Sequence, residues 1–264
     1  MNALKRNNVT VTGKGEKPML FAHGYGCDQN MWRYITPAFQ DDYKIILFDH
    51  IGFGSSDTTT YTKEQYSSLK AYAADILEIC EELELQDVVF VGHSVSAMIG
   101  VLAANMEPKR FAKLVLISPS PSFINDGDYI GGFEREDIHG LLNSLESDYL
   151  GWSNTIAPVI MGNTDRPELG QELAQSFCKS NQKVARDFAH LTFLSDCRQD
   201  LPHVKVDTLI LQCSEDAIAP VSVGEYTSKQ IPSSKLRVLE ATGHCPNLSA
   251  PEETVAAMKS FLYA

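Results

Sequence analysis

The sequence predicts an α/β fold in which a mostly parallel sheet is flanked by helices and carries an inserted helical segment. Short apolar runs bounded by turn residues recur along the 264-residue chain, and segments of helical character lie between them. Continuous rather than alternating apolar character is typical of parallel strands that are covered on both faces. Strands that alternate with helices favour right-handed crossovers and hence a parallel sheet.

Six strands and four helices are expected to build this sheet and its covering layers. Five strands are continuous apolar runs, at 18–23, 44–49, 87–92, 113–117 and 208–213, and a sixth at 236–240 would be the last. Helices are expected at 64–84, 96–106, 222–230 and 251–262. The first helix has one apolar stripe, formed by Tyr72, Ile76, Leu77 and Cys80. The last begins with Pro251, a residue favoured in the first turn of a helix.

Residues 122–196 interrupt the alternation of strands and helices. The stretch is amphipathic, rich in aromatic residues and without a convincing strand. We interpret it as a helical cap, or lid, inserted after the strand at 113–117. The predicted α/β core then comprises residues 1–121 and 197–264, a length that suits one domain.

Charge and composition exclude several classes of partner. The formal net charge is -12 and no run of Lys or Arg exceeds two, so no basic patch for nucleic acid or an anionic membrane surface is expected. No stretch approaches the roughly 18 apolar residues of a membrane span, and the first residues lack the apolar run of a secretory signal. Six cysteines without a C-x-x-C pair suit reduced thiols. We expect a cytoplasmic protein that binds neither nucleic acid nor membrane.

A serine lies where the strand at 87–92 changes directly into an alanine-rich helix. The junction reads Gly92-His93-Ser94-Val95-Ser96. A tight strand-to-helix turn strains such a serine and lifts its hydroxyl clear of the sheet, provided that the residues two before and two after are small. The start of a helix also favours negative charge. Ser94 is therefore the predicted nucleophile, and the Val95 N–H is one predicted oxyanion donor.

A serine nucleophile needs a base and a carboxylate that orients the base. Asp216 follows the strand at 208–213, at the sheet edge where such folds usually bind ligands. Glu215 is the alternative carboxylate, although the turn residue Pro220 favours Asp216. His244 lies in a loop between the last predicted strand and the final helix. The chain order Ser94, Asp216, His244 is the order of the α/β-hydrolase arrangement.

The second oxyanion donor is expected from the loop at 23–27, which reads His-Gly-Tyr-Gly-Cys. Its glycines let the backbone turn so that the Tyr25 N–H points toward the same place as the Val95 N–H. Neither this loop nor the one at 52–57 has the third glycine of a dinucleotide fingerprint, and the histidines lack metal-ligand spacing. We expect no cofactor and no metal.

A substrate pocket is expected between the serine turn and the cap. At helical spacing most cap aromatics are core residues, so only two or three should face the cavity. The predicted pocket residues are His93, Phe133, Trp152 and Phe193. His93, directly before the nucleophile, is expected to pack against the turn rather than to titrate.

Five segments resemble the RsbQ-like α/β hydrolases, a group that contains the bacterial stress regulator RsbQ and is similar to the plant strigolactone and karrikin receptors. They read HGYGCDQ, GHSVSAMIG, SPSPSFIND, GGFE and GHCPNLS, at 23–29, 92–100, 118–126, 131–134 and 243–249. The resemblance spans nearly the whole chain. It implies Ser94, Asp216 and His244 as a triad, oxyanion donors at Tyr25 and Val95, and a four-helix cap over an apolar pocket. It also implies slow hydrolysis of a small ester or lactone, coupled in several members to signalling through a partner protein.

Two residues depart from this family pattern. Tyr25 stands where relatives commonly have Phe, and Ser96 where some bacterial members have Gly. A more polar pocket, with a different ligand, is therefore expected.

The predicted function is that of a serine hydrolase acting on a small, mostly apolar ester or lactone. Two other classes stay open: a sensor that binds a ligand and signals to a partner with little turnover, and a binding module with an inert triad. A carbon–carbon bond hydrolase using the same residues is the alternative enzyme. Ser94 itself excludes a dehalogenase or epoxide hydrolase with an Asp nucleophile.

Overall fold

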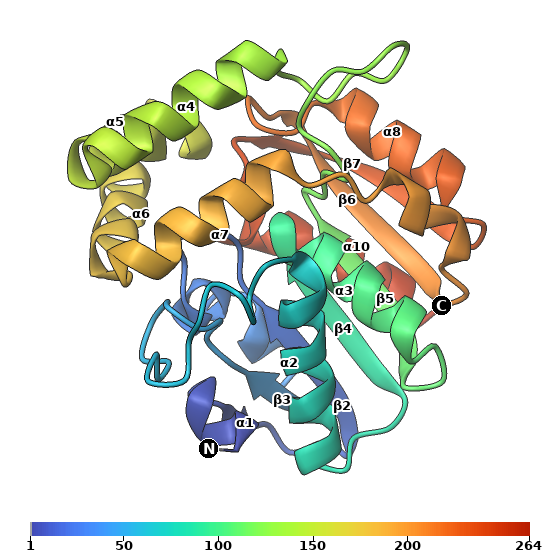
Figure 1. Ribbon diagram of the computed structural model, residues 1–264. Coiled ribbons are helices and arrows are strands. Elements are labelled where there is room, and N and C mark those ends of the chain that lie inside the picture. Colours follow the sequence, from blue (N-terminus) through green and yellow to red (C-terminus); the bar gives the residue numbers. More distant parts are fainter. Residues whose placement is uncertain (1) are drawn as a thin grey trace.

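The computed structural model describes residues 2–264, so residue 1 of the predicted core lies outside the described residues. Its centre is a seven-stranded sheet in the order β1-β3-β2-β4-β5-β6-β7 (Figure 1). The strands are β1 (Thr10–Thr12), β2 (Lys17–Ala22), β3 (Tyr43–Leu47), β4 (Val88–His93), β5 (Phe111–Ile117), β6 (Asp207–Glu215) and β7 (Ser234–Thr242). Strands β2 to β7 are parallel, and β1 pairs antiparallel with β3. The predicted α/β fold with a mostly parallel sheet is confirmed.

All six predicted strands form, with ends shifted by one or two residues. β7 extends beyond the predicted 236–240. It lies at the edge of the sheet, where polar side chains at its ends hid these residues from a prediction based on apolar runs. The sequence prediction missed β1, whose three residues are all exposed and show no apolar pattern.

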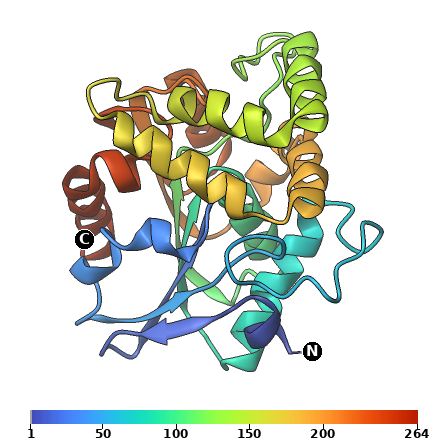
Figure 2. The ribbon, with the colours of Figure 1, turned by 90° about the vertical axis from the view of Figure 1, so that its left-hand side faces the viewer.

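Helices cover both faces of the sheet. α2 (Leu69–Glu82) and α3 (Val95–Met106) lie on one face and α10 (Pro251–Leu262) on the other (Figure 2), while α8 (Val221–Gln230) packs on β6 and β7. α2 begins later than the predicted residue 64, because residues 64–68 form turns and bends. The short helices are α1 (Ala3–Arg6), α9 (Pro246–Ser249) and the 3-10 helices Gln29–Trp32, Thr36–Ala38 and Arg198–His203.

Four helices between β5 and β6 form a layer over one end of the sheet (Figures 1 and 2). They are α4 (Arg135–Ser147), α5 (Tyr149–Met161), α6 (Pro167–Lys179) and α7 (Gln182–Leu194). We call these four helices the cap. They fall within the predicted insertion at 122–196, whose first residues form a loop with two isolated bridges. The exact division of the chain into core and cap stays a prediction.

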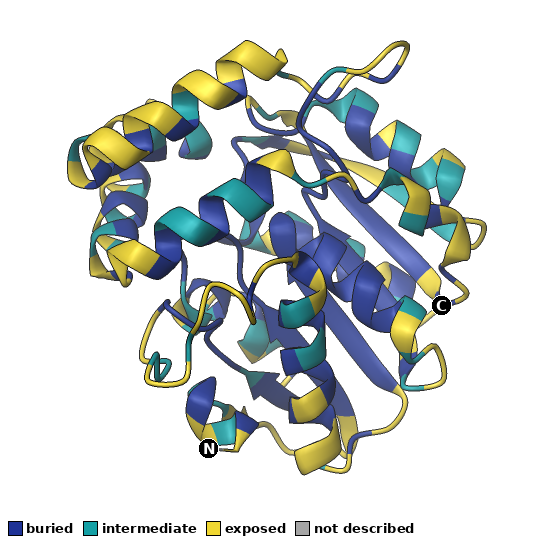
Figure 3. Ribbon diagram, in the orientation of Figure 1, coloured by how far each residue is buried: buried dark blue, intermediate teal, exposed yellow. Residues whose placement is uncertain are grey.

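The core lies between the sheet and its helices, where the central strands are buried along most of their length (Figure 3). Every residue of β4 and ten of the twelve in α3 are buried, so the junction between these two elements is held rigidly. Five of the six cysteines are buried, and no disulfide occurs within residues 2–264. Over the same residues, none of the helices combines the length and the apolar character that crossing a bilayer requires.

Candidate active site

Ser94 occupies a strained turn between β4 and α3. Its backbone angles are φ 56° and ψ −123°, a conformation that costs a non-glycine residue about 1–3 kcal/mol. The turn is tight enough that a Cβ on Gly92 would lie 2.5 Å from the Ser96 carbonyl oxygen and 2.7 Å from the Phe90 ring. Buried neighbours therefore hold the strain, and the predicted strand-to-helix turn places the Ser94 hydroxyl at the carboxyl edge of the sheet.

His244 bridges Ser94 and Asp216. Its Nε2 atom lies 2.8 Å from Ser94 Oγ, and its Nδ1 atom lies 2.7 Å from Asp216 Oδ2. Ser94 and His244 are buried, and the Asp216 side chain is fully buried. The three residues follow β4, β6 and β7, whose carboxyl ends meet at one edge of the sheet.

The Asp216 carboxylate is held by three hydrogen bonds. Besides His244, its Oδ1 atom accepts the backbone N–H groups of Ile218 (2.8 Å) and Ala219 (3.1 Å). Burial alone would raise the pKa of Asp216, but the neighbouring His244 and these N–H donors together bring that pKa below its ordinary value. Glu215, the alternative from the sequence, is exposed and accepts the Thr242 hydroxyl (3.1 Å). The structure thus pairs Asp216 with His244.

The loop that carries His244 rests on the end of α5. The His244 N–H donates to the Ile160 carbonyl (2.8 Å), and the Gly243 N–H donates to the Glu215 carbonyl (2.7 Å). Gly243 has φ 88°, and a Cβ there would lie 1.9 Å from the Met161 carbonyl oxygen. Only glycine fits this approach, so the residue before His244 decides how closely the loop meets the cap.

We call residues 23–27 the oxyanion loop, and it packs directly on the serine turn. A Cβ on Gly24 would lie 2.5 Å from His93 Nδ1 and 3.3 Å from Ser94 Cβ. Within residues 2–264, no acceptor pairs with the N–H group of Tyr25 or of Val95. Both predicted oxyanion donors are therefore available to a ligand.

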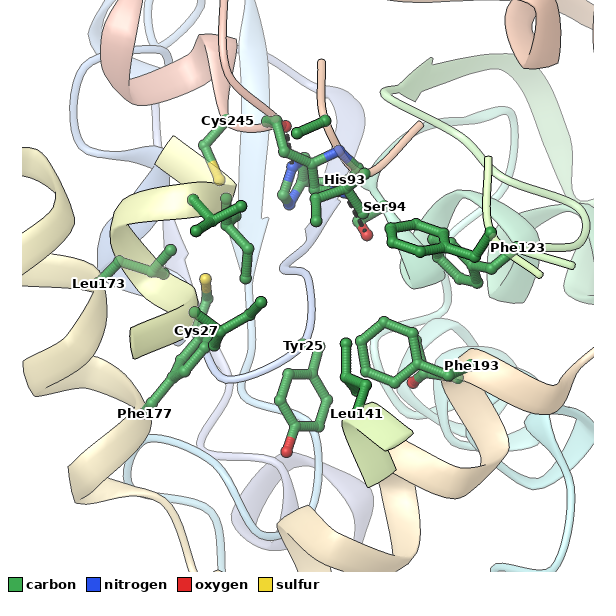
Figure 4. A pocket seen from close by; sticks show the side chains of 18 residues that line it. Tyr25, Cys27, His93, Ser94, Phe123, Leu141, Leu173, Phe177, Phe193 and Cys245 are labelled. Atoms are coloured by element: carbon green, nitrogen blue, oxygen red, sulfur yellow. Dashed lines mark hydrogen bonds between the residues drawn. The ribbon is translucent and has the colours of Figure 1, made fainter. Parts of the chain in front are cut away.

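The two residues that depart from the family pattern do not make the cavity more polar. The Tyr25 hydroxyl points away from Ser94 (Figure 4) and donates to the Ala185 carbonyl of α7 (3.1 Å). Ser96 is fully buried behind the turn and donates to the His23 carbonyl. The expectation of a more polar pocket was wrong, because both hydroxyl groups are used to join parts of the protein.

His50 is a neighbour of the site that sequence reasoning missed. Because Ser96 Oγ donates to a carbonyl, the His50 Nε2–H is the donor in its 2.7 Å bond to that hydroxyl. Burial lowers the pKa of His50 well below its ordinary value, which keeps the ring neutral. The residue lies just beyond β3, and no motif marked it.

His93 lies beside the serine turn, as expected. Its Nε2–H donates to the His244 carbonyl (2.8 Å). Burial and the nearby His244 lower the pKa of His93 to about 3, so the ring is neutral near pH 7. One face lines the cavity, where it contributes bulk but no charge.

The cavity lies between Ser94 and the cap and encloses about 700 Å³ of space outside protein atoms, part of it open to solvent (Figure 4). Its walls are mostly apolar, and none of the lining residues in the described chain is Lys or Arg. Three predicted residues line it: His93, Phe133 and Phe193. Lining residues that the sequence prediction missed include Phe123, Leu141, Ile156, Ile160, Leu173 and Phe177.

Trp152, predicted to face the cavity, does not line it. Its ring stacks on Phe177, with centroids 5.8 Å apart and planes at 14°, and meets the Tyr25 ring edge-on at 6.1 Å. Phe177 takes the place on the cavity wall. Trp152 lies one helical turn before Ile156, where α5 already packs against α6, so periodicity alone could not separate the two positions.

Comparisons with known proteins agree with this geometry. A family model described as the alpha/beta hydrolase family matches residues 19–257. The chain is 38% identical over 253 residues to karrikin insensitive 2 receptor CA of Petunia hybrida, covering 96% of this chain and 94% of that one. It is 35% identical over 262 residues to strigolactone esterase D14 of Arabidopsis thaliana, covering 99% and 98%.

A solved structure of a hydrolase from Oleispira antarctica superposes with a TM-score of 0.96 at 41% identity, covering 99% of this chain and 96% of that one. The similarity to the plant strigolactone and karrikin receptors is confirmed, while the closer grouping with RsbQ stays a prediction. This chain belongs to the alpha/beta hydrolase family.

Proposed function

We propose that this protein is a serine hydrolase that cleaves a small, uncharged ester or lactone. The observation that carries the proposal is the chain of two hydrogen bonds from Ser94 Oγ through His244 to the Asp216 carboxylate, which opens on an apolar cavity. An alcohol, an imidazole and a carboxylate in this order are the parts that acyl transfer needs.

The first half-reaction forms an acyl-enzyme. His244 Nε2 takes the Ser94 proton as Oγ attacks the carbonyl carbon of the ligand, and Asp216 stabilises the imidazolium that results. When the tetrahedral intermediate collapses, the carbon–oxygen bond to the leaving alcohol breaks. His244 gives its proton to that oxygen, so neutral imidazole returns; with a lactone, the alcohol stays attached to the acyl group.

Two backbone N–H groups, those of Tyr25 and Val95, are proposed to stabilise the oxyanion. Both belong to segments that touch Ser94: Val95 is the next residue, and the oxyanion loop packs on Ser94 Cβ through Gly24. The N-terminus of α3, which begins at Val95, adds a favourable potential for negative charge. Removing one such donor typically costs about 100- to 1000-fold in turnover.

The second half-reaction releases the acid. His244 takes a proton from a water molecule, whose oxygen attacks the acyl carbon, and the Ser94–acyl bond then breaks as His244 returns the proton to Oγ. The Nδ1 atom keeps its bond to Asp216 throughout, so the imidazole stays oriented for both steps.

The cavity supports the substrate class. Its walls offer no cation for a carboxylate or phosphate, and the Thr192 hydroxyl on its surface already donates to the Phe188 carbonyl (2.8 Å). A ligand therefore has polar partners chiefly at the Ser94 end, while the remainder contacts apolar side chains. A relative at 35% identity is named a strigolactone esterase, which favours an ester or lactone of a small apolar molecule.

Activity-based labelling tests this proposal. We expect a fluorophosphonate probe to modify Ser94, located by peptide mass spectrometry, and short p-nitrophenyl esters to be hydrolysed. Ser94→Ala should lose both, while Ser153→Ala, which removes a buried cap hydroxyl bonded within α5, should keep both. A wild-type protein that neither hydrolyses esters nor reacts with the probe would contradict the proposal.

A second candidate function is ligand sensing with little turnover, coupled to a partner protein. A relative at 38% identity is named a receptor, and the mostly apolar cavity suits a ligand that is held as well as cleaved. Titrating a candidate lactone into Ser94→Ala, with melting temperature and partner binding as readouts, separates sensing from hydrolysis.

The six unpaired cysteines support a reducing compartment, such as the cytoplasm, as the location of this protein.

A further inference from the structure

We infer that the cap sets the position of the oxyanion loop, and that Tyr25 and Ser176 are the positioning residues that make this link. The inference rests on the proposed serine hydrolase function and states how the cap controls that activity. Acylation of Ser94 is fast only while α6 and α7 pack on this loop. Two contacts on the cap side of the loop carry this inference, together with the hydrogen bonds that hold the other end of the loop to the core.

The first cap contact is the Tyr25 side chain, which reaches out of the loop into the cap. Its hydroxyl donates to the Ala185 carbonyl of α7 at 3.1 Å. Its ring lies among aromatic rings of three cap helices, with centroid distances of 5.6 to 6.1 Å to Phe177, Trp152, Phe188 and Phe193. Phe could fill this place, but only Tyr adds the hydrogen bond to the α7 backbone.

The second cap contact holds the loop backbone itself. Ser176 Oγ of α6 donates to the Gly26 carbonyl at 2.7 Å. Gly26 has φ 71°, and a Cβ there would lie 2.0 Å from the Phe177 ring. The loop is thus fitted against α6 with no space for a side chain, so a shift of α6 must move Gly26 or break the bond.

The other end of the loop is tied to the serine turn. Ser96 Oγ donates to the His23 carbonyl, and the His23 Nδ1–H donates to the Gly24 carbonyl at 2.8 Å. His23 Nε2 accepts the His50 N–H at 2.9 Å, which settles the neutral tautomer of His23. Residues 23 and 24 therefore stay with the core, whereas residues 25 and 26 follow the cap.

The proposed oxyanion donor, the Tyr25 N–H, lies at the boundary between these two anchored parts. Displacing α6 and α7 would turn the Gly24–Tyr25 peptide while Ser94, His244 and Asp216 stay bonded to one another. A ligand large enough to hold these helices apart would bind and yet be cleaved slowly, because a misplaced N–H donor stabilises the transition state less than it does when aligned.

The test compares four single variants and one double variant of the full chain. Tyr25→Phe and Ser176→Ala each remove one hydroxyl that joins the loop to the cap, and the double variant combines these two substitutions. Tyr129→Phe and Ser153→Ala are matched controls, because these buried hydroxyls donate to the Ser122 carbonyl (2.6 Å) and the Tyr149 carbonyl (2.7 Å), away from the loop. Acylation rates are measured by stopped flow with a p-nitrophenyl ester, and KM and kcat at steady state.

We expect acylation of the double variant to be about 10- to 100-fold slower, with KM changed less than threefold, because the misaligned Tyr25 N–H stabilises the oxyanion less. Affinity for an alkyl boronic acid, which forms a tetrahedral adduct on Ser94, should fall by a similar factor. The controls should stay within twofold of wild type in both measurements. Unchanged acylation in an active, folded double variant, or a loss confined to KM, would overturn the inference.

A second measurement covers the case in which the double variant does not fold. In ¹⁵N-labelled wild type and Ser176→Ala, the Tyr25 amide resonance is followed as the boronic acid binds. We expect the large shift of an oxyanion donor in wild type and a reduced shift in the variant, and equal shifts would overturn the inference. If wild type itself fails to hydrolyse esters, it is the proposed function that fails.

Discussion

The Nε2 atom of His244 lies 2.8 Å from the Oγ atom of Ser94, although 150 residues separate them along the chain. The parallel sheet makes this possible, because β4 and β7, which are separated by β5 and β6, end at the same edge of the sheet. The approach also depends on two backbone conformations with positive φ, at Ser94 and at Gly243. Predictions about activity and about stability can therefore be made from the same few residues.

The strain at Ser94 can be measured by comparing two inactive variants. Ser94→Ala keeps a Cβ in the φ 56° conformation, whereas Ser94→Gly removes it. We expect both to lose ester turnover and the Gly variant to be more stable by about 1 kcal/mol, because glycine adopts this region without steric cost. Urea unfolding monitored by circular dichroism gives the difference. Equal stabilities would mean that the turn stores little strain.

Asp216 and Glu215 are adjacent carboxylates with different expected roles. Asp216→Asn should lower kcat by about 1000- to 10000-fold, because the amide orients the wrong imidazole tautomer. Glu215→Gln, the matched control, should change kcat less than threefold, since the exposed Glu215 side chain bonds only to the Thr242 hydroxyl among the described residues. Steady-state hydrolysis of a p-nitrophenyl ester measures both, and a reversed order would assign the orienting carboxylate to Glu215.

We expect the substitution of glycine by alanine to have opposite effects on stability at Gly92 and at Gly140. Gly92→Ala would bring a Cβ within 2.5 Å of the Ser96 carbonyl oxygen, so we expect a loss of at least about 3 kcal/mol or no folded protein. Gly140→Ala, inside α4 with open space around the new Cβ, should add about 1 kcal/mol through helix propensity. Chemical unfolding of the two variants checks this, and a stable Gly92→Ala would show that the turn is looser than described.

Three buried histidines predict that the fold weakens in mild acid. Burial lowers the pKa values of His23, His50 and His93, the last to about 3, so below pH 6.5 the unfolded chain binds protons that the folded protein does not. Asp75, whose pKa burial raises to about 6, acts in the opposite direction with one proton. The free energy of unfolding should therefore fall as pH drops from 6.5 to 5, because over this range the unfolded chain takes up more protons than the folded protein.

Urea unfolding at pH 7, 6 and 5 measures this slope. His139→Gln removes an exposed histidine and serves as the control, since it should leave the slope unchanged. A free energy of unfolding that stays constant or rises toward pH 5 would contradict the neutral, buried state of the three rings.

Local sequence determined much of the fold. Five of the six expected strands, β2 to β6, could be predicted because each is buried along most of its length, which leaves a continuous apolar run in the sequence, whereas β7 is mostly exposed. Ser94 could be singled out because a nucleophile turn needs small residues at fixed offsets. The expected chain order of nucleophile, acid and base then limited the candidates for the other two triad residues. The edge strand β1 gave no such signal, since exposed residues on a short edge carry little apolar pattern.

Contacts between distant segments were decided only by the tertiary structure. The carboxylate partner of His244 is Asp216 because two backbone N–H groups aim its side chain inward, whereas Glu215 turns to solvent. Trp152 stacks behind Phe177, which helical spacing could not reveal. The hydroxyls of Tyr25 and Ser96 bond to α7 and to the oxyanion loop. The local sequence determines which reactive residue types are present. The direction in which each side chain points depends on packing between segments that are far apart in the chain.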